Sequence, residues 1–428
     1  MKLCFIGSGY VGLVSAACFA DLGHEVFCVD KDNVKIESLK KGIVPFYEPG
    51  LGELVKKNVE QGHLKFTKDL KEALTSSNIV FITVGTPSSY DRRADLSQVR
   101  NAAFEIGKNI SDYKVIVNKS TVPVGTADLV EKIIKENQTK KVPFDVISNP
   151  EFLREGNAIY DFMNPDRVVI GTSSEKAKVI MEKLYSSFSK VMFTDVRSAE
   201  MIKYASNAFL ATKVSFINEV ANLCEKVGAD VTEVAKGMGH DKRIGADFLN
   251  AGIGFSGSCF PKDTKALAEI AKENGCESEI VSAAIKVNDK QKLIPILKLK
   301  DILGDIRGKT IGILGLSFIP DTDDIRDAAS IDIIRALLAE GADVKATDPV
   351  ATFNMKKMFP KLMYFEDVYE TVKNCDALIL VTEWNEYKGI DFAKVKNLMR
   401  KPIIIDGRNL FNREELEKLG FYYEGIGR

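Results

Sequence analysis

The feature that most constrains the fold is a glycine pattern near the N-terminus, where residues 7–12 read GSGYVG. A short apolar run, residues 2–6, precedes it and is typical of a buried parallel strand, while residues 11–22 have the apolar spacing of a helix. A second apolar run, residues 25–29, ends at Asp30. A G-x-G-x-x-G pattern between a strand and a helix, with an acid after the next strand, predicts a dinucleotide-binding turn. The alternative is an ordinary glycine-rich turn beside a solvated aspartate.

This turn also predicts a cofactor. Backbone without a Cβ can approach a pyrophosphate closely at a helix N-terminus. We therefore expect cofactor contacts from Gly7, Gly9, Tyr10, Val11 and Gly12. Asp30 can accept hydrogen bonds from ribose hydroxyls, and its charge would repel a 2′-phosphate, so the sequence favours NAD over NADP.

The alternation of strands and helices continues along the chain. Further strands are expected at residues 79–84, 115–119 and 144–148, and again in the second half at 309–314 and 343–347, where the glycine pattern is weaker. Residues 198–227 contain no glycine or proline and are apolar on most faces, which predicts one long buried helix.

We therefore predict an α/β fold: two Rossmann-like, doubly wound parallel-sheet domains joined by a long central helix. The predicted divisions are an NAD-binding domain over residues 1–197, a central helical and dimerisation domain over 198–300, and a second nucleotide-binding domain over 301–428. A helix this long between two α/β domains is a natural element for forming a homodimer.

Composition excludes several classes of protein. The 428 residues carry a formal net charge of -1, so nothing attracts nucleic acid or an anionic membrane globally, and an anionic ligand needs a local site. The seven cysteines form no C-x-x-C pair and the three histidines are scattered, which predicts no disulfide framework, no metal site and a reducing, cytoplasmic location. No run of 18 apolar residues suggests a membrane span.

A candidate nucleophile lies within residues 252–263, which read GIGFSGSCFPKD. The glycine-rich run leads to Cys259, and we expect Asp263 to be the N-cap of a helix over residues 264–274. A thiol near a helix N-terminus, with Lys262 close by in sequence, is a place where the thiolate is favoured. The alternative is a buried structural cysteine.

Other candidates lie on the long helix and at the ends of strands. Lys203 and Asn207 are four residues apart and share a helix face. A buried lysine is costly unless it is paired or functional, the alternative being that Lys203 reaches the surface. Loops that follow predicted strands lie where ligands bind in open parallel sheets. These loops read VGTP (84–87), KSTVPVGT (119–126) and NPEFLREG (149–156). In the second half, Arg326 and Arg408 either clamp a phosphate or are ordinary surface charges.

Further motifs extend over nearly the whole chain. In order they read GSGYVGLVSA, Asp30, YEPGL, VGTP, KSTVPVGT, NPEFLREG, KYASNAFLATKVSFINEVANLCEKVGAD, the cysteine stretch, TDDIRDAAS and DGRN. Together they resemble the UDP-glucose/GDP-mannose dehydrogenase family. The segment DKRIGADFLNAGIGFSGSCFPKD is more similar to the UDP-glucose branch than to the GDP-mannose or N-acetylhexosamine branches.

The resemblance implies an NAD-dependent, four-electron oxidation of UDP-glucose at C6 to UDP-glucuronate, a precursor for polysaccharide or envelope synthesis. An aldehyde cannot release a second hydride until a nucleophile makes its carbon tetrahedral, and Cys259 matches that nucleophile, through a thiohemiacetal and a thioester. Lys203 and Asn207 match residues that stabilise alkoxide charge. The residues that match positions for activating water, with the general base left open, are Asp263, Thr121 and Glu151.

The resemblance also implies binding residues. Cofactor contacts are implied for Lys35, Thr83, Thr86, Pro87, Ser120, Thr121, Glu155, Lys262 and Arg326. Substrate contacts are implied for Glu151, Phe152, Leu153, Lys203, Asn207, Phe248, Leu249, Asn250, Gly252, Gly257 and Arg408. Arg243 matches an arginine that reaches the substrate of the neighbouring subunit.

Three alternatives to this function stay open. The same chemistry could act on another nucleotide sugar, such as a UDP-N-acetylhexosamine or GDP-mannose. A two-electron hydroxyacid dehydrogenase shares the layout but needs no cysteine, so Cys259 argues against it. A non-catalytic sensor of NAD or of a nucleotide sugar would not need four residues together: Cys259, Lys203, Asn207 and Asp263.

The chain departs from the family pattern at two positions. Ser256-Gly257 stands where the family usually has two glycines, and Ile319 stands where it usually has a basic residue that helps to bind substrate. Because Ile319 removes a charge contact, we expect Ile319→Lys to lower the Michaelis constant for UDP-glucose while leaving the chemistry intact. Steady-state kinetics test this, and an unimproved Michaelis constant would contradict it.

Overall fold

The computed structural model describes residues 1–428. The chain divides into two compact units, Met1–Ser206 and Asn207–Arg428. One helix, α9 (Val196–Val227), runs across this division. The predicted domain boundaries at residues 197 and 300 stay predictions.

The first unit is built on an eight-stranded sheet with the order β3-β2-β1-β4-β5-β6-β7-β8. Its strands are β1 (Lys2–Ile6), β2 (Glu25–Val29), β3 (Leu64–Thr67), β4 (Ile79–Ile82), β5 (Lys114–Asn118), β6 (Phe144–Ser148), β7 (Val168–Gly171) and β8 (Val191–Thr194). All neighbours are parallel except β6 and β7, which pair antiparallel. Strands such as β4 are apolar without alternation because helices cover both faces of the sheet.

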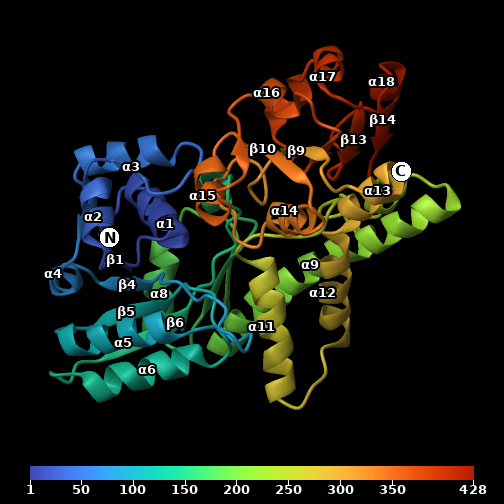
Figure 1. Ribbon diagram of the computed structural model, residues 1–428. Helices are drawn as coiled ribbons and strands as arrows, with labels where there is room; N and C mark the ends of the chain where they lie inside the picture. The colour runs from blue at the N-terminus through green and yellow to red at the C-terminus, as the bar shows by residue number, and fades with distance from the viewer. The chain divides into compact units, whose positions relative to one another are not determined.

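Helices cover both faces of this sheet. They are α1 (Tyr10–Asp21), α2 (Asn33–Lys40), α3 (Leu51–Glu60), α4 (Leu70–Thr75), α5 (Ser97–Asn109), α6 (Thr126–Asn137), α7 (Ala158–Met163) and α8 (Glu175–Leu184). Figure 1 shows α1 and α3 on one side of the strands and α5 and α6 on the other. Each side has its own core: α1, α3, α7 and α8 pack around Phe5, Phe19 and Phe81, and α4, α5 and α6 pack on the opposite face.

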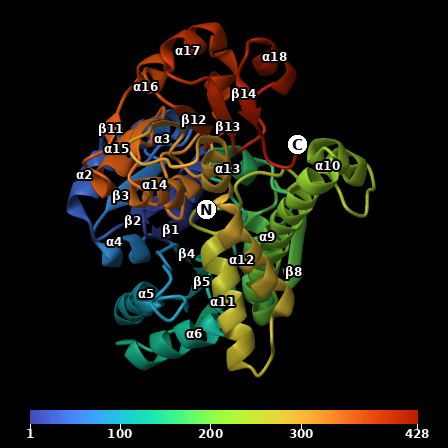
Figure 2. The ribbon, with the colours of Figure 1, turned by 45° about the vertical axis from the view of Figure 1, so that its right-hand side comes forward.

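The second unit is built on a six-stranded, all-parallel sheet with the order β11-β10-β9-β12-β13-β14. Its strands are β9 (Thr310–Leu314), β10 (Asp343–Thr347), β11 (Met363–Tyr364), β12 (Ala377–Leu380), β13 (Ile403–Asp406) and β14 (Tyr422–Glu424). Its further elements are α10 (Val231–Gly239), α11 (Phe260–Glu273), α12 (Glu279–Gln291), α13 (Ile294–Leu303), α14 (Ala329–Ala339), α15 (Thr352–Met358), α16 (Val368–Val372), η1 (Asn385–Gly389), α17 (Phe392–Leu398) and α18 (Arg413–Lys418). Helices α11 and α12 lie side by side (Figure 2).

The predicted architecture is confirmed, since each unit has a doubly wound sheet and α9 joins the two units. One local prediction is wrong: Asp263 is not the N-cap of its helix. Helix α11 begins at Phe260, and Cys259 is its N-cap residue. The prediction took Pro261 as the end of the loop, but proline also fits the first turn of a helix, and Pro261 lies there in α11. No helix combines the length and apolar character that crossing a membrane requires.

A contact at the point where the strand order reverses shapes the first unit. Gly7 follows β1 with φ +105°, and a Cβ on it would lie 2.7 Å from the carbonyl oxygen of Thr83, which follows β4. The Thr83 hydroxyl donates to the carbonyl oxygens of Ile6 and Gly7 at 3.0 and 2.9 Å. Gly12, in the first turn of α1, packs against the same two residues.

We expect Gly12→Ala to destabilise the first unit, because the new methyl group would lie 2.0 Å from the Gly7 oxygen and 2.6 Å from Thr83 Oγ1. Overpacking of this kind costs about 1–3 kcal/mol, which denaturant unfolding would measure. Gly9→Ala is the matched control, since nothing lies within 4 Å of a Cβ there. Equal free energies of unfolding for the two variants would contradict the packing argument.

Candidate active site

In the first unit, the turn after β1 has the geometry of a phosphate cradle. Gly9 is the N-cap residue of α1, and the space that a Cβ would fill at this glycine is open. Helix N-termini leave backbone N–H groups without intrahelical acceptors, and these groups attract anions. The predicted residues Gly7 to Gly12 therefore stand together around an open position.

Asp30 lies at the end of β2 beside this turn. Its carboxylate accepts hydrogen bonds from Ser8 Oγ at 2.6 Å and Ser8 N at 3.0 Å, and Lys35 Nζ lies 3.1 Å away. Burial alone would raise the pKa of the Asp30 carboxyl, but the hydrogen bonds from Ser8 and Asp32 and the charge of Lys35 lower it to about 2. Asp30 is thus ionised at neutral pH, as an acceptor for ribose hydroxyls needs to be.

The two loops that follow β4 and β5 are tied to each other. Thr86 Oγ1 donates to the Thr121 carbonyl oxygen at 2.8 Å, and Ser120 Oγ donates to the Val84 carbonyl oxygen at 2.7 Å. Thr83, Thr86 and Ser120 are buried, while Pro87 is exposed. These three hydroxyls donate within the protein, so the two loops are held to each other and to the turn after β1.

The loop after β6 forms a buried ion pair with α9. Lys203 Nζ lies 3.0 Å from Glu151 Oε1, and both side chains are 5% exposed, so Lys203 is not at the surface. Burial alone would raise the pKa of the Glu151 carboxyl, but the Lys203 ammonium and the Leu153 N–H, which donates at 2.6 Å, hold it below its ordinary value. The ring of Phe152 lies 5.3 Å from Lys203 Nζ.

A second lysine, which the sequence analysis did not single out, adds charge to this pair. Lys119 is buried and donates to Asn149 Oδ1 at 3.3 Å. Burial lowers the pKa of Lys119 to about 8, with the Glu151 charge opposing this shift and the Lys203 charge adding to it. One carboxylate therefore faces two cationic side chains in a buried site, which suits the stabilisation of a developing negative charge.

In the second unit, Cys259 stands at the N-terminus of α11. The N–H of Asp263 donates to the Cys259 carbonyl oxygen at 2.8 Å, so Asp263 lies one turn into the helix. The Asp263 side chain is fully buried; its carboxylate accepts from Asn207 Nδ2 at 2.6 Å and pairs with Lys262 Nζ. Four predicted residues (Cys259, Lys262, Asp263 and Asn207) are therefore clustered.

Buried amide side chains hold the loop that leads to Cys259. Asn288 on α12 binds the backbone of Phe255 on both sides, with Oδ1 accepting from its N–H at 2.7 Å and Nδ2 donating to its carbonyl at 3.0 Å. Gly252 is held likewise, by Asn218 Oδ1 at 2.8 Å and Gln291 Nε2 at 2.8 Å. The sequence analysis missed these amides, because each binds backbone groups far along the chain and no sequence pattern records such a partner.

Of the predicted nucleotide-binding residues of the second unit, Gly252 and Arg408 lie against each other. Arg408 Nε donates to the Val381 carbonyl at 2.8 Å, and a Cβ on Gly252 would lie 3.5 Å from Arg408 Cδ. Leu249 is buried and Asn250 is exposed, and the Phe248 and Phe260 rings lie 5.9 Å apart. A Cβ on Gly257 would lie 2.5 Å from the Phe318 ring, so this glycine is required.

The two other predicted arginines of the second unit each pair with an aspartate two residues earlier in the sequence. Arg243 is 89% exposed at the side chain and pairs with Asp241 at 2.5 Å. Arg326 pairs with Asp324 on the loop before α14. No group of three or more His, Cys, Asp or Glu side chains has the arrangement of a metal site.

We expect Asn288→Ala to lower kcat by about 10-fold or more, because a reacting group that shifts by an ångström loses much of its rate. The change leaves the buried N–H and carbonyl of Phe255 without partners. Asn274→Ala is the matched control, since this exposed amide donates only to Ile270 of its own helix. Equal kcat values for the two variants would contradict a role for the clamp.

Three family models match the chain in order. They describe the NAD binding domain (residues 1–189), the central domain (197–290) and the UDP binding domain (312–413) of the UDP-glucose/GDP-mannose dehydrogenase family.

Individual relatives agree. The chain is 52% identical to UDP-glucose 6-dehydrogenase TuaD of Bacillus subtilis, over 100% of this chain and 93% of that protein. The solved structure of a UDP-glucose dehydrogenase from Pyrobaculum islandicum superposes with a TM-score of 0.93 at 38% identity, covering 99% of this chain and 97% of that one. A UDP-D-ManNAc dehydrogenase from Pyrococcus horikoshii has a TM-score of 0.88 at 28% identity, covering 100% and 99%. The chain therefore belongs to the UDP-glucose/GDP-mannose dehydrogenase family, and its cofactor is NAD.

Proposed function

We propose that the protein oxidises UDP-glucose at C6 to UDP-glucuronate in two NAD-dependent steps, with Cys259 as the covalent nucleophile. The observation that carries the proposal is the place of Cys259 at the N-terminus of α11, one turn from the buried Asp263. A hydride transfer that stops at an aldehyde or ketone needs no thiol, whereas oxidation to a carboxylate needs a nucleophile.

The residues of the first unit fit NAD. The open position at Gly9 leaves room for a pyrophosphate, and the ionised Asp30 can accept from a ribose hydroxyl. Bound NAD supplies the chemistry of hydride acceptance, once in each step. The remaining proposed contacts come from the tied loops with Thr83, Thr86 and Ser120 and from Lys35, Glu155, Lys262 and Arg326.

Lys203 and Asn207 serve the first oxidation. As the C6 hydroxyl loses its proton, the Lys203 ammonium and the Asn207 amide stabilise the alkoxide charge. Glu151 holds the Lys203 ammonium at 3.0 Å, and Asp263 holds the Asn207 amide at 2.6 Å, so neither donor has to be oriented during the reaction. These two residues lie four positions apart on α9.

Cys259 serves the second oxidation. Its thiolate adds to the aldehyde carbon, which forms a C–S bond and places the charge on the former carbonyl oxygen. Loss of a hydride from this thiohemiacetal gives a thioester, and attack by water breaks the C–S bond and returns the thiolate. The sum is one alcohol, two NAD⁺ and one water to one carboxylate, two NADH and three protons. Asp263, Glu151 and Thr121 are the proposed residues for orienting the water.

UDP-glucose is the proposed substrate because the relative with 52% identity is a UDP-glucose 6-dehydrogenase, whereas the UDP-D-ManNAc dehydrogenase is only 28% identical. Arg408 beside the loop of residues 248–252, together with Gly257, forms the proposed substrate contact in the second unit.

We expect two NADH per mole of limiting UDP-glucose, and no complete turnover for Cys259→Ser. The measurement is NADH absorbance with UDP-glucose, UDP-N-acetylglucosamine and GDP-mannose in parallel. Cys276→Ser is the matched control, because Cys276 is an exposed cysteine outside the proposed site. One NADH per sugar, or full turnover without the Cys259 thiol, would rule out the thioester route; another sugar giving the full yield would reassign the substrate.

We further propose that the protein is a homodimer through α9. Phe209, Phe216 and Leu223 are 66, 50 and 60% exposed and recur at seven-residue intervals, the spacing of a helix–helix seam. Arg243, 89% exposed, is the residue proposed to reach the partner's substrate. A cytoplasmic location stays a prediction from the cysteine pattern.

We expect Phe216→Glu to halve the mass measured by sedimentation, because it places a charge in the proposed seam. Val179→Glu is the control, since Val179 is also exposed but lies on α8. A monomeric wild-type protein, or an unchanged mass for Phe216→Glu, would contradict this interface.

A further inference from the structure

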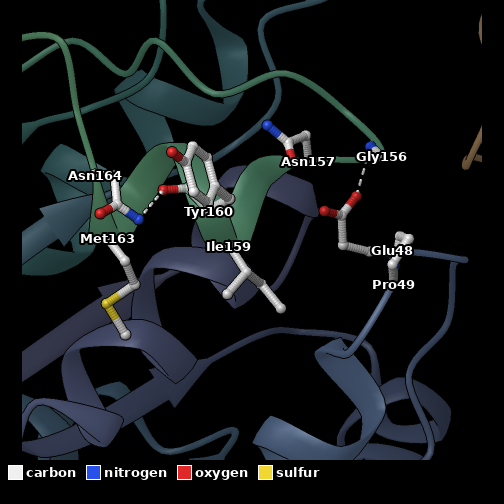
Figure 3. Close-up of a pocket in the computed structure, with 8 residues that line it drawn as sticks. All are labelled: Glu48, Pro49, Gly156, Asn157, Ile159, Tyr160, Met163 and Asn164. Carbon is white, nitrogen blue, oxygen red and sulfur yellow. Dashed lines mark hydrogen bonds between the residues drawn. The ribbon is translucent and has the colours of Figure 1, made fainter.

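Glu48 belongs to the YEPGL motif, to which neither the proposed site nor the proposed chemistry gives a role. The side chain is 6% exposed. It lies just before α3, in the wall of a surface hollow whose other side is formed by α7 (Figure 3). A buried carboxylate is costly unless it is fully hydrogen-bonded, so its partners indicate what it does.

Three donors from two distant parts of the first unit meet on this carboxylate. The Tyr10 hydroxyl donates to Oε2, the Gly156 N–H donates to Oε2 at 2.7 Å, and the Ala158 N–H donates to Oε1 at 2.7 Å. Figure 3 shows the carboxylate pointing at the Gly156 backbone. Glu48 therefore joins the start of α1 to the end of the loop over residues 149–156.

Both joined segments belong to the proposed cofactor site. Tyr10 is the first residue of α1, directly after the open position at Gly9. Glu155 immediately precedes Gly156, and its charge contributes to the shift of the Tyr10 hydroxyl. Burial, together with the facing carboxylates of Glu48 and Glu155, raises the pKa of Tyr10 far above its ordinary value, so the hydroxyl remains a donor.

The segment that carries Glu155 is fixed on both sides of this residue. Arg154 is held by Asp161 on α7, with its N–H at 2.9 Å and its guanidinium at 2.6 Å from the carboxylate. With Gly156 bound to Glu48, the backbone is held on both sides of Glu155. The Tyr10 ring in turn packs against Phe46, with 5.1 Å between the ring centroids.

We propose that Glu48 is a positioning residue for NAD: by binding Tyr10, Gly156 and Ala158 together, it sets the distance between the phosphate-binding end of α1 and Glu155. The inference rests on the proposed cofactor contacts of Tyr10 and Glu155. Loss of the carboxylate leaves the Tyr10 hydroxyl and the Ala158 N–H without their acceptor, leaves the Gly156 N–H only the Tyr10 oxygen at 3.1 Å, and lets the loop move relative to the turn. NAD affinity then falls, because Glu48 acts through Tyr10 and through the loop that carries Glu155.

The test is NADH affinity measured by fluorescence titration of the full chain, which needs no catalysis. We expect Tyr10→Phe, which removes one donor and keeps the ring, to raise the Kd for NADH three- to ten-fold. Glu48→Gln should raise it further, and the double variant should bind no more weakly than Glu48→Gln, because the hydroxyl acts through the carboxylate. In steady state, KM for NAD should rise by a larger factor than kcat falls.

The matched control is Asp21→Asn, at the opposite end of α1. Asp21 also links this helix to α3, through Lys57 at 2.6 Å and Asn58 at 3.3 Å. It should lower the melting temperature without changing the Kd. An unchanged Kd in Tyr10→Phe and Glu48→Gln, or an equal rise in Asp21→Asn, would overturn the inference. Absence of NADH binding in the wild type would instead overturn the proposed function.

Discussion

A glycine pressed against a threonine where the strand order reverses is the contact on which the rest of each unit depends. Gly7 meets Thr83 in the first sheet, and in the second a Cβ on Gly315 would lie 2.4 Å from Thr382 Cβ. The threonine hydroxyl then binds the backbone of the turn, at Gly7 in one unit and at Ser317 in the other, at 2.9 and 2.5 Å. Only glycine allows this approach, and the approach turns the chain toward the carboxyl edge of the sheet, where ligands of such folds bind.

The aspartate that follows the second strand has different surroundings in the two units. Each has an aspartate after its second strand, and in the first unit Asp30 is bound mainly by Ser8 and Lys35 near the open position at Gly9. In the second unit Asp348 is buried and accepts from Leu316 N at 2.6 Å, Ala351 N at 2.7 Å and Trp384 Nε1 at 3.1 Å. Asp30 also accepts hydrogen bonds within its unit, four in all, so Asp348 differs from it in being more deeply buried and in accepting six. The same topology thus supports an NAD site in one unit and a different nucleotide site in the other.

Much of this arrangement was predictable because it is encoded locally. Apolar runs of four to five residues between segments of helical apolar spacing identify the strands. The glycines that follow a strand identify the turn at which a ligand can bind. Asn288, Gln291 and Glu48 were not predictable in the same way, since each binds backbone groups far along the chain and no periodicity records a partner. The first residue of α11 was predicted wrongly for a simpler reason: a proline is compatible with both the end of a loop and the first turn of a helix.

The candidate site is also where the protein accepts buried charge. With a net charge of -1 over the chain, an anionic ligand needs a local site, and in the first unit Lys203 and Lys119 lie buried beside Glu151. Burying such groups contributes little stability, and a single unpaired one would be costly. In the reaction that we propose, their value is preorganisation: donors already aligned by Glu151 and Asp263 need not reorient when alkoxide charge develops. The apolar cores supply the stability of the two units, and the buried charged groups of the candidate site lie after β5 and β6, on α9 and on α11.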